Sequence, residues 1–89
     1  MKDEGELVKR IEEIKKQIDT IINDMSVPKN VRSAVIDAKN SLNAPGDYTI
    51  RVSNAIYNID SISNDINLQP QARTVIWNIL SQLESIKED

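Results

Sequence analysis

The stretch that decides the fold is residues 7–25, LVKRIEEIKKQIDTIINDM. Its apolar residues recur at alternating steps of four and three, namely Leu7, Ile11, Ile14, Ile18, Ile21 and Met25. This spacing gives one apolar stripe on an α-helix, of the kind that packs against a neighbouring helix. We therefore expect a first helix from about Asp3 to Met25, with the stripe in the core.

The same pattern returns 41 positions later, as YTIRVSNAIYNIDSISNDI over residues 48–66. At this offset the chain matches itself without a gap, with identities that include Arg10/Arg51, Ile18/Ile59, Asp24/Asp65, Arg32/Arg73 and Leu42/Leu83. A period of this length is typical of repeated helical hairpins. We expect a single helical domain over residues 1–89, with repeat one at about 9–48 and repeat two at about 50–89.

Breaks in the pattern divide each repeat into two helices. Pro28 and Pro70 are expected in the first turns of helices, where proline is tolerated. Asn43-Ala44-Pro45-Gly46-Asp47 separates the two hairpins, and Asp47 can cap the helix that follows. The remaining apolar stripes are Val31, Val35, Ala38 and Leu42; then Val52, Ala55, Ile59, Ile62 and Ile66; then Ala72, Ile76, Ile79, Leu83 and Ile86.

The prediction is an all-α protein of four helices in two repeated hairpins. About three repeats are normally needed for a stable solenoid, and this sequence holds two. The hairpins are therefore expected to form a four-helix bundle or a HEAT-like pair, or to complete their core by dimerising. The sequence leaves these arrangements open.

The composition argues against several classes of function. The chain has no Cys and no His, which removes thiolate and imidazole chemistry and the usual zinc ligands. We expect no enzyme, no cofactor and no metal. A net charge of −3 makes nucleic-acid binding unfavourable. The absence of a long apolar run or a leader-like start predicts no membrane association and a cytoplasmic location.

Four charged residues near the turns are predicted to be structural. Asp24 and Asp65 could bind a cation, and Arg32 and Arg73 could bind an anion. However, the aspartate and the arginine each stand at the same position of both repeats. A residue present in both repeats serves the repeated hairpin first. We therefore interpret Asp24, Arg32, Asp65 and Arg73 as turn residues, with an arginine pairing with Asp24 or Asp65 across the hairpin turn.

Trp77 is the most informative single position. Its repeat counterpart is Ile36, so it is either a core position at the edge of the stripe or a partly exposed anchor with Arg73 stacked on the indole. Tyr57, whose counterpart is Lys16, could extend such a surface. The candidate interaction surface is Arg73, Trp77, Tyr57 and Leu80.

The interpretation we favour is a non-enzymatic protein-interaction or scaffolding module that forms a homodimer or binds an unknown protein partner. The alternative is an accessory protein on nucleic acid or a ribonucleoprotein. That alternative requires the basic residues to share one face, among them Arg10, Arg32, Arg51 and Arg73.

Four stretches carry a resemblance to a known family. They are Val-Pro-Lys-Asn-Val-Arg (27–32), Arg-Val-Ser-Asn-Ala-Ile (51–56), Ile-Ser-Asn-Asp (62–65) and Ala-Arg-Thr-Val-Ile-Trp-Asn-Ile-Leu-Ser-Gln-Leu-Glu (72–84). The chain resembles a small archaeal family of uncharacterised proteins of about this length. The resemblance implies a compact, cytoplasmic helical protein with no assigned function and no catalytic residues. One departure is Leu-Gln-Pro-Gln (68–71), where the family pattern leads us to expect proline one residue earlier.

Overall fold

The computed structural model describes residues 4–88, except for the side chain of Glu88. It contains the four predicted helices: α1 (Glu4–Ile22), α2 (Lys29–Asn43), α3 (Tyr48–Asp60) and α4 (Pro70–Glu88). The all-α prediction is confirmed, and no strand occurs within residues 4–88. The expected helix start at Asp3 and the repeat end at Asp89 lie outside the described residues.

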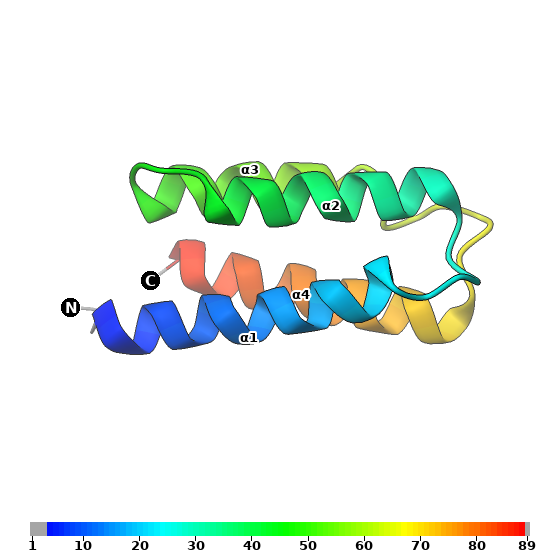
Figure 1. Cartoon of the computed structure of the whole chain (residues 1–89), viewed down its shortest axis with the longest axis horizontal. Coiled ribbons are helices and arrows are strands. Elements are labelled where there is room, and N and C mark those ends of the chain that lie inside the picture. Colours follow the sequence, from blue (N-terminus) through cyan, green and yellow to red (C-terminus); the bar gives the residue numbers. More distant parts are fainter. Residues whose placement is uncertain (1–3, 89) are drawn as a thin grey trace.

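The four helices run alternately up and down in an elongated bundle of 39 × 21 × 19 Å (Figure 1). α1 packs against α2 and α4, and α3 packs against the same two helices, whereas the backbones of the diagonal pairs do not approach each other closely within residues 4–88. A HEAT-like stack would place α1 against α3. The structure is therefore the closed four-helix bundle of the two arrangements that the sequence left open.

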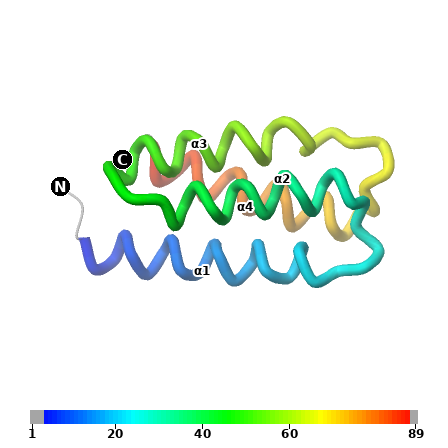
Figure 2. The backbone as a smooth tube through the Cα atoms, turned by 45° about the horizontal axis from the view of Figure 1, so that its top comes forward, coloured from blue at the N-terminus to red at the C-terminus, as the bar shows by residue number. Residues whose placement is uncertain are grey.

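The core follows the repeat. Under the 41-position offset each buried apolar residue from Ile11 to Leu42 has a buried counterpart from Val52 to Leu83. Since α1 and α3 run parallel on one diagonal and α2 and α4 on the other, an approximate twofold axis runs along the bundle. It emerges between the α1–α2 and α3–α4 turns, which lie at the same end (Figure 2).

The prediction is wrong for two residues of the apolar stripes, which lie outside the core. Met25 is 81% exposed and Ile66 is 90% exposed, although both continue the apolar spacing. The reason is that α1 ends at Ile22 and α3 at Asp60, so the chain has left the helical path before it reaches either residue. Ile62, just beyond α3, remains buried in the turn.

The α2–α3 turn forms as the sequence indicates. The side chain of Asp47 accepts a hydrogen bond from the backbone N–H of Thr49 at 2.7 Å, which confirms it as the N-cap of α3. Gly46 before it has a φ of +113°, a conformation that a residue with a Cβ rarely adopts. This turn fixes where the second hairpin begins.

Candidate functional site

The α1–α2 and α3–α4 turns have the same hydrogen-bonded geometry. The Oδ1 atom of Asp24 accepts from the Ser26 backbone N–H at 2.9 Å, and the Oδ1 atom of Asp65 accepts from the Asn67 N–H at 2.8 Å. The backbone bonds of these turns also coincide under the repeat offset: Asp24 N to Ile21 O with Asp65 N to Ile62 O, and Val27 N to Asp24 O with Leu68 N to Asp65 O. Both aspartates close turns through Asx geometry.

These bonds also determine the charge state of the aspartates. The Ser26 hydroxyl donates to Asp24 Oδ1 at 2.6 Å, and together with the Ser26 N–H it lowers the pKa of Asp24. The pKa of Asp65 is lowered first by a side-chain bond from Asn30 and then by the Asn67 N–H. Both side chains are therefore carboxylates at neutral pH.

The two turns differ in what reaches the second carboxylate oxygen. Asn30, the second residue of α2, donates from Nδ2 to Asp65 Oδ2 at 2.8 Å. This bond joins the first hairpin to the second. The residue at the equivalent place in α4 is Gln71, which makes no side-chain hydrogen bond within the described part of the chain. The Oδ2 atom of Asp24 likewise has no hydrogen-bond donor there.

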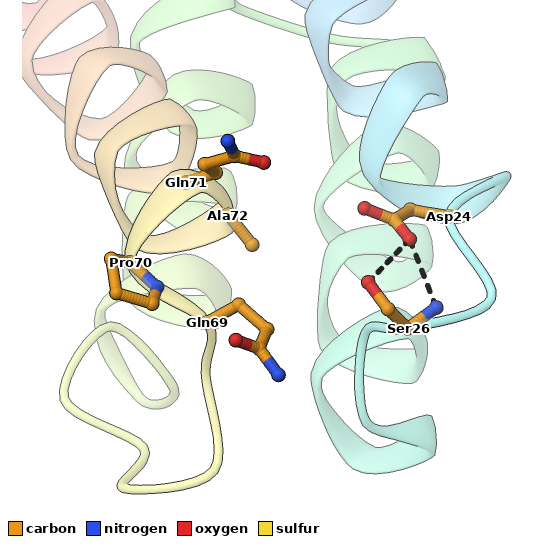
Figure 3. Close-up of a pocket in the computed structure, with 6 residues that line it drawn as sticks. All are labelled: Asp24, Ser26, Gln69, Pro70, Gln71 and Ala72. Atoms are coloured by element: carbon orange, nitrogen blue, oxygen red, sulfur yellow. Dashed lines mark hydrogen bonds between the residues drawn. The ribbon is translucent and has the colours of Figure 1, made fainter.

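A cavity of about 530 Å³ lies where this missing contact would be. Asp24 and Ser26 form one wall, and the start of α4 forms the other, with the side chains of Gln69, Pro70, Gln71 and Ala72 across the gap (Figure 3). The cavity is thus the open counterpart of the closed Asn30–Asp65 contact. Its lining offers carboxylate, hydroxyl and carboxamide groups.

The two repeated arginines do not pair with the carboxylates of Asp24 and Asp65, so the pairing predicted from the sequence is wrong. Arg73 donates from Nη2 to the backbone carbonyl of Asp65 at 3.0 Å, and Arg32 directs Nη1 to the sulfur of Met25 at 3.8 Å. Each guanidinium nevertheless lowers the pKa of the aspartate in its own turn, as the last of several causes. The Nε atom of each arginine is buried without a hydrogen-bond partner.

Trp77 lies on the surface, with 52% of the residue exposed, and Ile36 at the equivalent place is 41% exposed. Arg73, Trp77 and Leu80 share one side of α4, because they are spaced by four and three residues. Arg73 and Leu80 are half-buried there, and Leu80 packs against the core. The guanidinium of Arg73 is engaged by Asp65, and Trp77 makes no ring contact with it within residues 4–88.

Tyr57 is the predicted surface residue that the structure sets apart from this row. It lies on α3, the neighbour of α4, and is 77% exposed. The structure therefore gives Arg73, Trp77 and Leu80 as one continuous row, with Tyr57 on the adjoining helix. We call the row of Arg73, Trp77 and Leu80 the Trp77 face.

Sequence reasoning missed Asn30 and Gln71 as the residues that distinguish the two turns. A signal was available, because these two carboxamides coincide under the repeat offset and differ by one methylene group. Their distinct contacts depend on the distance across the bundle between the hairpins. Sequence spacing does not contain that distance.

Two classes of feature are not seen in the described part of the chain. No group of three or more acidic side chains comes close enough to hold a metal ion within residues 4–88. None of the four helices combines the length and the apolarity that crossing a membrane requires.

The fold and the turns define a small repeat-built four-helix bundle with one closed and one open turn contact at the same end. The chain belongs to the uncharacterised protein family UPF0147, whose sequence pattern matches residues 1–86. This match confirms the resemblance to a small archaeal family of uncharacterised proteins. The description of this family assigns it no activity.

Individual relatives agree with this assignment. The UPF0147 protein of Methanothermobacter thermautotrophicus is 45% identical over 85 residues, which cover 94% of this chain and 80% of the relative. The crystal structure of a UPF0147 protein from Thermoplasma acidophilum matches with a TM-score of 0.82 at 29% identity, over 88% of this chain and 93% of that one. The crystal structure of the unknown-function protein MMP1188 matches with a TM-score of 0.84 at 35% identity, over 88% and 90%.

Proposed function

We propose that the protein is a non-enzymatic, cytoplasmic protein-interaction module that associates with a second copy of itself through the Trp77 face. The observation that carries this proposal is the half-exposed indole of Trp77 beside the half-buried Leu80 and Arg73. Tryptophan and arginine are enriched among the residues that dominate binding energy at protein interfaces. The face also has an apolar base, because Leu80 packs on the core.

The area that Trp77 leaves exposed is large enough to stabilise an interface when a second copy covers it. An aromatic side chain presents about 200 Å², so a 52% exposed tryptophan leaves roughly 100 Å² in water. Covering that area at about 25 cal/mol/Å² contributes roughly 2.5 kcal/mol per copy. In a symmetric dimer each copy contributes its own indole, which doubles this term. The remaining contacts must offset the entropy lost on association.

Size-exclusion chromatography with light scattering tests the proposal across a range of protein concentrations. We expect the mass to rise from monomer to dimer as concentration increases. The variant Trp77→Ala should stay monomeric at concentrations where the wild-type chain is a dimer. Because the indole is exposed, this variant should keep its helical circular dichroism signal and nearly all of its thermal stability.

Ile36→Ala is the matched control, since Ile36 holds the equivalent place in the first repeat and is also partly exposed. We expect it to dimerise like the wild-type chain. A wild-type protein that stays monomeric at every accessible concentration would overturn the self-association proposal. A dimer that Ile36→Ala disrupts and Trp77→Ala does not would assign the interface to the first repeat.

The arginines in residues 4–88 do not favour the nucleic-acid alternative. The four arginines lie on four different helices, and each contacts its own chain. Arg51 donates to the backbone carbonyl of Leu42, and Arg10 donates to the Ser85 hydroxyl at 3.1 Å. Such dispersed and engaged guanidinium groups do not support a basic face, so we propose only the protein-interaction function.

A further inference from the structure

The contact between Asn30 and Asp65 indicates what kind of group fits the equivalent place at Asp24. In the second repeat the Asn30 carboxamide supplies an N–H to Asp65 Oδ2 at 2.8 Å. The first repeat has the same turn geometry at Asp24 and the same backbone path, yet no donor reaches Oδ2 within the described residues. A cavity of about 530 Å³ occupies this place. Ligand pockets commonly have volumes of roughly 300–1,000 Å³.

The groups that line the cavity favour a cationic hydrogen-bond donor as the bound group. The free carboxylate oxygen of Asp24 can accept hydrogen bonds from N–H groups, and the carboxamide oxygens of Gln69 and Gln71 on the opposite wall can accept from the same group. The first turn of α4 on its own would favour an anion. Asp24 lines the same cavity and opposes an anion by its charge. The net charge of −3 adds to the attraction for a cation.

The chain itself does not supply this cation. Arg32 is the basic residue that influences Asp24, but its Nη1 atom is directed to the sulfur of Met25. A lysine ammonium fits the lining better than a planar guanidinium, because its three rotatable donors can address oxygens on both walls.

Two exposed apolar side chains lie in the turns at this end of the bundle. Met25 lies between Asp24 and Ser26, which both line the cavity, and is 81% exposed. Ile66 is 90% exposed in the other turn at the same end of the bundle. Two such exposed side chains at one end are suited to bury apolar residues of a bound segment.

We propose that the cavity at Asp24 binds a lysine side chain from an extended segment of a partner protein, with apolar neighbours of that lysine covering Met25. The inference rests on the proposed protein-interaction function, but it uses a different surface from the Trp77 face. Asp24 binds the ammonium group through Oδ2, and the carboxamides of Gln69 and Gln71 complete its hydrogen bonds. The occupied Asn30–Asp65 contact is the equivalent arrangement within the chain.

Titration of the full-length ¹⁵N-labelled protein with the peptide acetyl-Leu-Lys-Leu-amide tests this site by NMR. We expect saturable shifts of the Ser26 backbone signal and the Gln69 and Gln71 side-chain amides. A peptide with norleucine in place of lysine should bind at least fivefold more weakly. Equal binding of the norleucine peptide, or no saturable shift with the lysine peptide, would overturn the proposal. An arginine peptide that binds more tightly would overturn the assignment to lysine.

Asp24→Asn removes the charge and should weaken the lysine peptide at least fivefold, whereas the matched variant Asp65→Asn should change its affinity less than twofold. Equal losses in the two variants would contradict the site. Gln71→Asn is the second variant. It places an asparagine at position 71, and asparagine is the residue type that closes the other turn at Asn30. It should also weaken binding while leaving the carboxylate intact, and it decides the matter if Asp24→Asn does not fold.

The two proposals fail separately. A protein that forms dimers but does not bind the lysine peptide overturns the inference at Asp24 alone. A protein that binds the peptide at Asp24 but stays monomeric overturns the assignment of the Trp77 face alone.

Discussion

Asn30 donates a hydrogen bond from its Nδ2 atom to Oδ2 of Asp65 at 2.8 Å and so joins α2 to the turn between α3 and α4. The contact links the two hairpins at the end of the bundle where the approximate twofold axis emerges. Its equivalent between Gln71 and Asp24 is not made, and a cavity lies between the two residues. The two repeats therefore share the backbone geometry of their turns at Asp24 and Asp65 but differ in this contact between the hairpins.

Removing the Asn30 side chain should change the titration of Asp65. The Asn30 bond is the largest cause that lowers the pKa of Asp65, so Asn30→Ala should raise that pKa toward the ordinary value of an aspartate. A ¹³C NMR titration of the carboxyl carbons measures both aspartates in one sample. The pKa of Asp24, which depends mainly on Ser26, should stay unchanged and serves as the control. An unchanged pKa of Asp65 in Asn30→Ala would contradict the contact.

The same contact gives the stability a pH dependence. Because folding lowers the pKa of Asp65, its carboxylate stabilises the folded state at pH values above the unfolded pKa. This contribution is lost as the pH falls through the lower, folded-state pKa. Urea unfolding at neutral and acidic pH should therefore show a smaller loss on acidification for Asn30→Ala than for the wild-type chain. A loss as large as that of the wild type would show that Asn30 does not act through Asp65.

Ile59 and Ile66 provide a direct test of where the apolar stripe of the third helix ends. Ile59 is fully buried and Ile66 is 90% exposed, although both fit the same spacing. Ile59→Ala should lower the free energy of unfolding by about 2–5 kcal/mol, because it leaves a cavity in the core. Ile66→Ala should change it by less than about 0.5 kcal/mol. Chemical denaturation measures both, and similar losses would place Ile66 in the core.

The cap of α3 is expected to be worth a measurable amount of stability. Asp47 satisfies the Thr49 N–H, so Asp47→Ala should lower the free energy of unfolding by about 1 kcal/mol. Asp37→Ala is the control, since Asp37 is an exposed carboxylate within α2. We expect that control to lose less than about 0.5 kcal/mol. Equal effects of the two variants would mean that charge, and not capping, is responsible.

Most of the fold could be predicted because it depends on local spacing. The steps of three and four identify the buried faces, and Pro28, Pro70 and Asp47 mark helix starts. The stripe rule failed at Met25 and Ile66, because apolar spacing does not reveal where the backbone stops being helical. The choice of bundle over stack also lay beyond the sequence, since either arrangement buries the same residues.

The candidate site was less predictable for a physical reason. The spacing indicated that Asp24 and Asp65 belong to turns, but the partners of Arg32 and Arg73 depend on side-chain geometry across those turns. The exposure of Trp77 depends on how far α4 is rotated about its own axis. The apolar residues beside Trp77 in the sequence are compatible with more than one rotation. These quantities arise from packing between helices and have no local signature.

The emission of Trp77 gives the most direct measurement of the central claim, which is that this residue is a surface anchor for a second copy. The chain has a single tryptophan, so its fluorescence reports on this site alone. Dilution of the wild-type protein should shift the emission maximum to longer wavelength as the dimer separates and the indole enters water. The shift should follow the dimer fraction measured by light scattering and should persist in Ile36→Ala. An emission maximum that stays constant across the monomer–dimer transition would contradict the account.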